Sequence, residues 1–240
     1  MIPLRDENPT RTTPFVTIAL IAANVAAFLL QLGTERGRML AFALVPYDLT
    51  SGTDVVFPGG PQPVFLTIFT SMFMHANILH IAGNMLYLWI FGNNVEDTLG
   101  HFRFLLFYLA CGVAAAAAQI VMDPASQVPM MGASGAIGGV LGGYLMLFPG
   151  ANIVTLVFLG FFITTANIPA IFVLGIWILT QVVSLQYMAG YGGHMQGGVA
   201  YAAHIGGFLA GVILILLLGG RGRARRRRAR PLQLRRLYDG

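Results

Sequence analysis

The sequence predicts an all-α polytopic membrane protein with six transmembrane helices, and three observations support this prediction. Of the 240 residues, 56% are hydrophobic and only 10% are charged, whereas soluble domains carry about 25% charged residues. The mean hydropathy of the chain is +0.73. The apolar residues also gather in uncharged runs that are long enough to cross a bilayer, and a soluble core cannot absorb so much apolar sequence.

The apolar runs lie in a predicted membrane domain that covers residues 15–219, between a polar N-terminal segment at 1–14 and a basic tail at 220–240. We predict spans at about residues 15–32, 77–92, 103–122, 134–148, 168–186 and 199–218. The fourth run would be roughly 22 Å long as a helix, which is short for a hydrocarbon core of about 30 Å. A short helix fits if its outer end stops in a water-filled cavity.

Two further segments affect the number of spans. Residues 151–165 are also apolar, and as a seventh helix they would make Ser134 and His204 enter from opposite faces of the membrane. Six spans instead bring both residues to one depth on one side. We therefore expect 151–165 to lie in the cytoplasmic interface, and we expect the polar residues 93–101 to form a cytoplasmic turn.

Arginine sets the predicted orientation. The chain has no lysine, and nine of its arginines lie between residues 221 and 236. Beside a transmembrane helix such a run marks the cytoplasmic face and contacts anionic lipid, so we expect lipid rather than nucleic acid as its partner. Both termini are then expected in the cytoplasm of a cell membrane protein, with the loops at 123–131 and 186–198 outside.

Four polar residues inside the apolar runs point to chemistry. Ser134 begins the fourth span, His80 and Asn84 fall near the outer end of the second, and His204 lies about six residues into the last. A lone serine there is usually structural, but polar groups inside a membrane are costly and tend to mark function. A nucleophilic serine needs a base. Because lysine is absent, we predict a Ser134–His204 dyad.

Other protease chemistries are excluded. The predicted spans contain no aspartate, the sequence contains no H-E-x-x-H motif, and Ala136 breaks the G-x-S-x-G pattern of soluble hydrolases. No metal or cofactor is expected. His80 and Asn84 are four residues apart, on one face of a helix. They could supply donors for an oxyanion beside the Ser134 backbone N–H.

Glycine is the other feature of these spans. Pairs of glycines four residues apart let helix backbones approach each other closely. Such pairs occur in the fourth and last predicted spans, at 138/142, 139/143 and 207/211. They could press the serine helix against the His204 helix, although ordinary membrane packing also produces this pattern.

Over about residues 60–215, the chain resembles the rhomboid intramembrane serine proteases. The resemblance rests on the stretches HANILHIAGNM (75–85), GASG (132–135), AHIGGFLAG (203–211) and FGNNVEDTLG (91–100). It implies that Ser134 is the nucleophile and His204 its general base. It also implies that His80, Asn84 and the Ser134 N–H form the oxyanion hole.

The resemblance also implies roles for other segments. Residues 33–64 would form a membrane-embedded loop, 186–198 would cap the site, and the 168–185 helix would be a lateral gate. Substrates would be transmembrane segments of single-span or multi-span proteins, cut near the outer leaflet. They would unwind easily and carry small residues near the cleaved bond.

Two features depart from the family pattern. Leu66 and Thr67 stand where many members have a Trp-Arg pair. Some members carry an aromatic residue four positions after the serine, stacked on the histidine, whereas this chain has Gly138. Tyr201 is a candidate substitute for that ring. His75, just before the second span, is expected to be structural.

Two alternatives remain beside the protease. A rhomboid-like pseudoprotease would bind and escort transmembrane helices without cleaving them, although such proteins usually lack catalytic residues. A transporter would use the polar cluster as a solute site, and its uptake would survive loss of the Ser134 hydroxyl.

Overall fold

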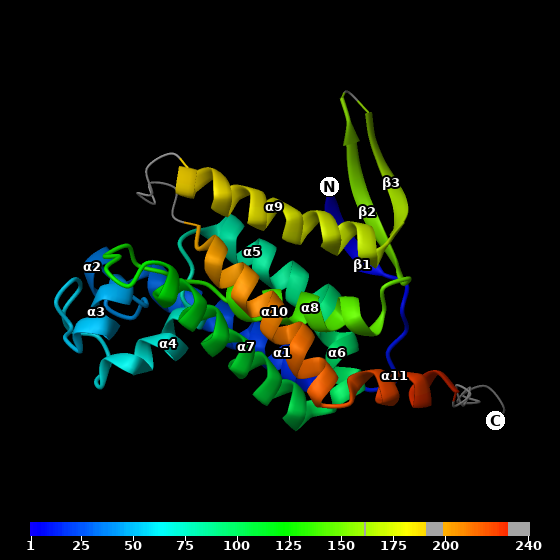
Figure 1. Cartoon of the computed structure of the whole chain (residues 1–240), viewed down its shortest axis with the longest axis horizontal. Helices are drawn as coiled ribbons and strands as arrows, with labels where there is room; N and C mark the ends of the chain where they lie inside the picture. Colours follow the sequence, from blue (N-terminus) through cyan, green and yellow to red (C-terminus); the bar gives the residue numbers. More distant parts are fainter. Residues whose placement is uncertain (161, 191–198, 230–240) are drawn as a thin grey trace.

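The computed structural model describes residues 1–160, 162–190 and 199–229, and Figure 1 shows the arrangement of the elements. The elements, in chain order, are β1 (Ile2–Asp6), α1 (Phe15–Leu32), α2 (Arg36–Leu40), α3 (Pro46–Ser51), η1 (Val64–Leu66), α4 (Thr67–Thr70), η2 (Ser71–Phe73), α5 (Ile78–Tyr87), η3 (Leu88–Gly92), α6 (Asn93–Leu99), α7 (His101–Met122), α8 (Ser134–Leu147), β2 (Asn152–Leu159), β3 (Phe162–Pro169), α9 (Ala170–Gly190), α10 (Tyr201–Leu217) and α11 (Gly220–Ala229).

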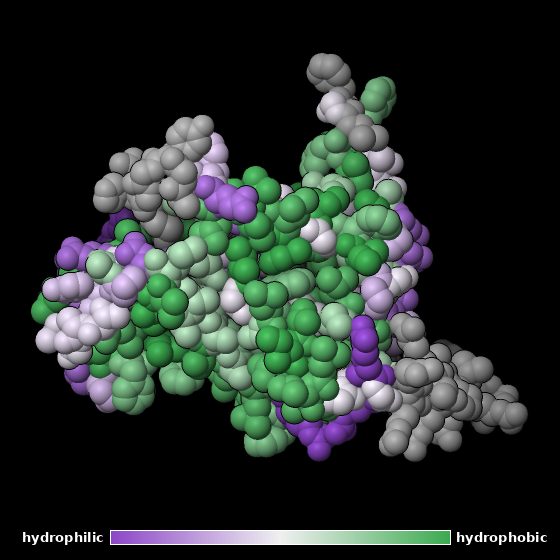
Figure 2. All heavy atoms as spheres, viewed as in Figure 1, coloured by the Kyte–Doolittle hydropathy of each residue, from purple (hydrophilic) through white to green (hydrophobic). Residues whose placement is uncertain are grey.

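Most of the described chain is helical, and several helices are suited to a bilayer. Helices α1, α7 and α9 are long and apolar enough to cross a membrane, and the bent pair Val64–Phe73 and Ile78–Leu99 brings the count of described spans up to four. Helices α8 and α10 are shorter, with 14 and 17 residues. Hydrophobic residues cover the middle of the face in Figure 2. The protein is therefore a multi-pass membrane protein, and up to four of the six predicted spans have full-length helices in the described residues.

Helix α8 is the most enclosed of these helices, because ten of its 14 residues are buried. Its closest neighbour is α10, and glycines make that approach. A Cβ on Gly211 would overlap the backbone of Gly139, and one on Gly207 would overlap the carbonyl of Gly135. The two backbones thus lie in direct contact, as the four-residue spacing of glycines predicted.

The chain is not all-α, because β1, β2 and β3 form an antiparallel sheet in that order. Ile2 lies opposite Leu156, and Asn152 lies opposite Pro169. The β2–β3 hairpin extends beyond the helices in Figure 1. The expectations for residues 151–165, an interfacial segment or a seventh helix, rested on apolarity alone. Their β-branched and aromatic side chains favour strands. The seventh helix considered above is thus not formed.

The predicted turn at 93–101 is wrong, because α6 continues the preceding helix to Leu99. Its acidic side chains accept hydrogen bonds from the N-terminal segment and from the first turn of α1. Glu96 is buried and accepts bonds from the backbone N–H groups of Val16 and Thr17, at 2.9 and 2.7 Å. These bonds satisfy donors that the first turn of α1 leaves unpaired. The turn comes only at Gly100, whose φ is +84°.

Asp6 connects the sheet to the C-terminal end of α8. Its Oδ2 accepts hydrogen bonds from Tyr144 Oη at 2.9 Å and from Asn94 Nδ2 at 2.6 Å. Partial burial raises the pKa of the Asp6 carboxyl to about 6, and the two hydrogen bonds oppose that rise only in part. The N-terminal segment is thereby tied to the helix that carries Ser134.

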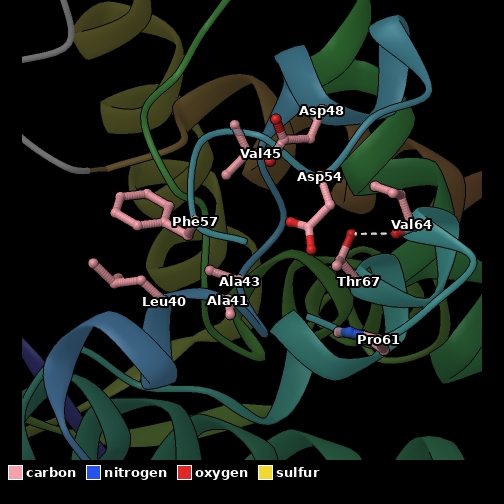
Figure 3. A pocket seen from close by; sticks show the side chains of 10 residues that line it. All are labelled: Leu40, Ala41, Ala43, Val45, Asp48, Asp54, Phe57, Pro61, Val64 and Thr67. Carbon is pink, nitrogen blue, oxygen red and sulfur yellow. Dashed lines mark hydrogen bonds between the residues drawn. The ribbon is translucent and has the colours of Figure 1, made fainter. Parts of the chain in front are cut away.

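The loop at 33–64 is held together by two aspartates. Asp54 Oδ2 accepts bonds from the backbone N–H groups of Gly59 and Gly60, and Asp48 Oδ1 from those of Val55 and Val56. Both carboxylates line a small cavity of about 10 Å³. Figure 3 shows the side chains around it, with the Thr67 hydroxyl bonded to the Val64 carbonyl. Both carboxylates accept hydrogen bonds from backbone N–H groups, which gives this loop a defined conformation.

Candidate active site

A cavity of about 650 Å³ contains all four of the predicted site residues. Ser134 and His204 line it from the starts of α8 and α10, and His80 and Asn84 line it from α5. The indole of Trp177, on α9, also faces it. Three helices therefore bring polar side chains to one cavity, and α9 adds an aromatic side chain to its wall.

Ser134 and His204 lie within hydrogen-bonding distance. The Oγ of Ser134 is 2.8 Å from Nε2 of His204. The close backbone contact between α8 and α10 makes this approach, because Gly135 and Gly207 leave no side chain between the two helices. Each residue lies in the first turn of its helix, so both face the same end of the bundle. A serine paired in this way has a base in position to take its proton.

His80 and Asn84 face the backbone just before Ser134. A Cβ added to Gly132 would lie 2.8 Å from His80 Nε2 and 3.6 Å from Asn84 Nδ2. Gly132 has φ +127°, a conformation that favours glycine. Asn77 caps α5 by accepting the His80 backbone N–H at 2.9 Å. The two side chains thus project from a well-formed helix start toward the serine.

His75, which was expected to be structural, contacts this cluster. The buried His75 ring places Nε2 2.9 Å from Asn84 Nδ2. Gln31 of α1 pairs with both the N–H and the carbonyl of His75, each at 3.0 Å. An amide nitrogen has two hydrogens, so Asn84 keeps one for another acceptor while His75 takes the first.

Helix α9 contributes two residues that the sequence analysis did not select. Gln181 Oε1 lies 2.7 Å from Nδ1 of His204, on the side of the ring away from Ser134. The Trp177 ring lies 5.9 Å from the His204 ring, with an angle of 34° between the planes. The signal was present: Trp177 and Gln181 are four residues apart on one helix face, and glutamine is a strongly polar residue inside a predicted span.

Trp177 also explains why position 138 carries no aromatic side chain. A Cβ on Gly138 would lie 2.9 Å from the carbonyl oxygen of His204, which is too close for any side chain. The indole of Trp177 instead reaches that space from α9 and passes 3.6 Å from the same Cβ position. Tyr201, the predicted substitute, meets His204 edge-on at 6.5 Å. Of the predicted cap at 186–198, residues 191–198 lie outside the described part of the chain.

Comparisons with known proteins identify the family of this chain. The family model for the Rhomboid domain matches residues 62–221. Rhomboid protein 1, mitochondrial, of Saccharomyces cerevisiae is 32% identical over 152 residues, which cover 62% of this chain and 40% of the yeast protein. The chain therefore belongs to the rhomboid family.

Two other relatives come from a plant and a bacterium. Rhomboid-like protein 11, chloroplastic, of Arabidopsis thaliana is 33% identical over 162 residues, or 65% of this chain and 53% of the plant protein. Rhomboid protease GluP of Bacillus subtilis is 35% identical over 132 residues, or 55% of this chain and 24% of that protein. The matched regions span about half or less of the length of these three relatives.

Proposed function

We propose that this protein is an intramembrane serine endopeptidase that cleaves transmembrane segments of other membrane proteins. The observation that carries the proposal is the 2.8 Å contact between Ser134 Oγ and His204 Nε2 inside a cavity walled by apolar helices. Membership of the rhomboid family and similarity to the rhomboid protease GluP of Bacillus subtilis support the same function.

The chemistry follows from the two atoms in contact. Ser134 Oγ attacks the carbonyl carbon of the scissile peptide bond while His204 Nε2 takes the hydroxyl proton. The imidazolium then gives that proton to the leaving amine, which leaves an acyl ester on Ser134. A water molecule, deprotonated by the same imidazole, hydrolyses the ester and restores both groups.

The negative charge that develops on the substrate oxygen needs donors in place before the reaction. Ser134 is the first residue of α8, so its backbone N–H has no partner within the helix. The positive end of the helix dipole lies at the same point. His80 Nε2 and the second N–H of Asn84 Nδ2 complete the proposed oxyanion hole.

The cavity suggests how a substrate is presented. It is lined by Leu79, Gly83 and Tyr87 of α5 and by Trp177 of α9, so we propose entry between these two helices. A stable helix hides its carbonyls in internal hydrogen bonds. Substrates should therefore be segments that unwind easily and carry small residues near the cleaved bond.

The proposed topology keeps six spans, with the short helices α8 and α10 completing the set. Both termini then lie in the cytoplasm, and the site faces the outer side of the cell membrane. The arginine tail rests on anionic lipid, where each arginine contributes about 1 kcal/mol.

To test the proposal, the purified full chain is incubated with a panel of single-span substrates, and any cleaved bond is located by mass spectrometry. We expect cleavage within the transmembrane segments, and we expect Ser134→Ala to abolish it with melting temperature near that of the wild type. Substrates that bind but stay intact would favour the pseudoprotease. Equal cleavage by Ser134→Ala would end the protease proposal.

A further inference from the structure

Gln181 contacts the catalytic base that the proposed function requires, from a helix that carries neither member of the dyad. We propose that Gln181 is a positioning residue that holds His204 in the tautomer able to accept the Ser134 proton. The inference rests on the proposed function, because it concerns the same dyad. It adds a third residue, on α9, and makes the reactivity of the dyad depend on where that helix sits.

The direction of each hydrogen bond follows from the acceptor at the far end. The Trp177 carbonyl can only accept, and the Thr180 hydroxyl lies 2.6 Å from it and donates to it. Gln181 Nε2 donates to that same carbonyl at 3.3 Å and to Thr180 Oγ1 at 3.2 Å. The amide nitrogen of Gln181 is thereby turned toward its own helix, and its oxygen is turned outward.

The outward oxygen decides the state of His204. Gln181 Oε1 is an acceptor, so the Nδ1 atom 2.7 Å away must carry the proton of the neutral ring. Nε2 is then the bare nitrogen, and it lies 2.8 Å from the Ser134 hydroxyl. Every bond in the series runs in one direction, from the serine through the imidazole and the amide to the Trp177 carbonyl.

An amide suits this position better than a carboxylate would. Soluble serine proteases use a buried aspartate to orient the histidine, but an ionised carboxylate inside a membrane is costly. Glutamine offers the same acceptor oxygen without a charge. It fixes the ring orientation and gives less stabilisation to the imidazolium than a carboxylate does.

The contact depends on the position of α9, because that helix is lightly packed near Gln181. Ala170, Val173 and Leu174, at its start, are buried. None of the residues from Gly175 to Met188 is fully buried. A shift of this half of α9 away from α10 would therefore break the bond to His204 at little cost in packing.

The test compares three variants of the full chain in one detergent. Gln181→Leu removes the acceptor, and Gln181→Glu keeps an acceptor oxygen at the same reach in either protonation state. Gln186→Leu makes the same change as the first at an exposed position on the same helix. We expect Gln181→Leu to lower kcat on the order of 10- to 100-fold with KM little changed, since the ring then loses its fixed orientation and the wrong tautomer also competes. Gln181→Glu and Gln186→Leu should stay within about threefold of wild type.

Two further readouts separate positioning from general structure. A small fluorophosphonate needs no substrate helix, so its labelling rate at Ser134 should fall in Gln181→Leu by the same factor as kcat. Two-bond proton–nitrogen NMR of histidine-labelled protein should show the His204 proton on Nδ1 in the wild type and mixed tautomers in Gln181→Leu. Melting temperatures confirm folding, and Gln181→Met serves as a second apolar variant if the leucine variant is unstable.

The outcomes are distinguishable. A wild-type protein that neither cleaves nor labels overturns the proposed function and this inference together. This inference alone is overturned if the wild type is labelled and a folded Gln181→Leu or Gln181→Met variant is labelled at a rate within twofold of it. Equal losses in the leucine and glutamate variants also overturn it, because the glutamate retains the acceptor. A loss in the apolar variant that the glutamate restores supports it.

Discussion

Helix α10 carries His204 between two neighbours that it contacts in different ways. Against α8, glycines bring backbone onto backbone, with Gly139 touching Gly211. Against α9, long side chains make the contact, with Trp177 and Gln181 reaching the His204 ring. The two interfaces therefore differ in function. The two reacting groups lie on a tightly packed pair of helices, whereas the groups that orient the base come from a helix that is lightly packed.

Outside the dyad itself, the largest effect on activity is expected from the oxyanion donors on α5. The double change His80→Ala with Asn84→Ala should lower the cleavage rate on the order of 10²–10³-fold, with substrate affinity little changed. These donors stabilise charge that exists only in the transition state. Turnover and apparent affinity in one detergent measure the effect.

The control for that experiment is Ile78→Ala on the same helix, whose side chain is 70% exposed. It should cleave at the wild-type rate. A double variant that cleaves within about threefold of wild type, with unchanged melting temperature, would show that the two residues are structural.

The comparison of the two α10 interfaces is tested by adding one methyl group on each side. Gly211→Ala places a Cβ against the Gly139 backbone and should reduce the free energy of unfolding by about 1–3 kcal/mol. Gly175→Ala on α9 meets nothing within 4 Å and should raise it by about 0.5–1 kcal/mol. Denaturation of the two variants in the same detergent makes the measurement. Equal effects would contradict the contrast between the interfaces.

A smaller effect is expected at the C-terminal end of α8, where Tyr144 donates a hydrogen bond to Asp6. The pKa of Asp6 is raised to about 6, so the folded state holds this proton more tightly than the unfolded chain does. Ionisation then costs stability, and the cost grows as pH rises from about 4 through about 6. Asp6→Asn should match the wild type near pH 4 and melt about 2–4 °C higher at pH 8, which corresponds to about 1 kcal/mol.

Solvent near this partly buried carboxyl screens the charge, which is why the expected gain is below the full pKa shift. Melting curves of both proteins across this pH range give the measurement. An advantage of the asparagine variant that was the same at pH 4 and pH 8 would show that Asp6 does not titrate as described.

The sequence was most informative where one physical requirement dominated. Uncharged runs indicated where membrane helices would lie, and glycine spacing indicated the contact between α8 and α10. Polar residues in apolar runs allowed the Ser134–His204 pair to be predicted from the sequence. Each of these signals comes from within a single run of residues.

The features that were missed depend on partners far away in the chain. The polar residues of α6 were predicted to form a solvated turn because their partners are not nearby in the sequence. Val16 and Thr17, which donate hydrogen bonds to Glu96, lie about 80 residues earlier. The β2–β3 hairpin, which also pairs with β1 at the start of the chain, was not predicted because apolarity alone does not distinguish strand from helix. Gln181 was overlooked because its partner, His204, lies on another helix.

The central claim is that His204 activates Ser134, and labelling by a fluorophosphonate tests it without any knowledge of the natural substrate. The full chain is treated with the probe, and the modified residue is identified by mass spectrometry in the wild type and in Ser134→Ala and His204→Ala. We predict a label on Ser134 in the wild type and none in either variant, with all three proteins folded by their melting curves. Labelling of Ser134 at an unchanged rate in His204→Ala would contradict the claim.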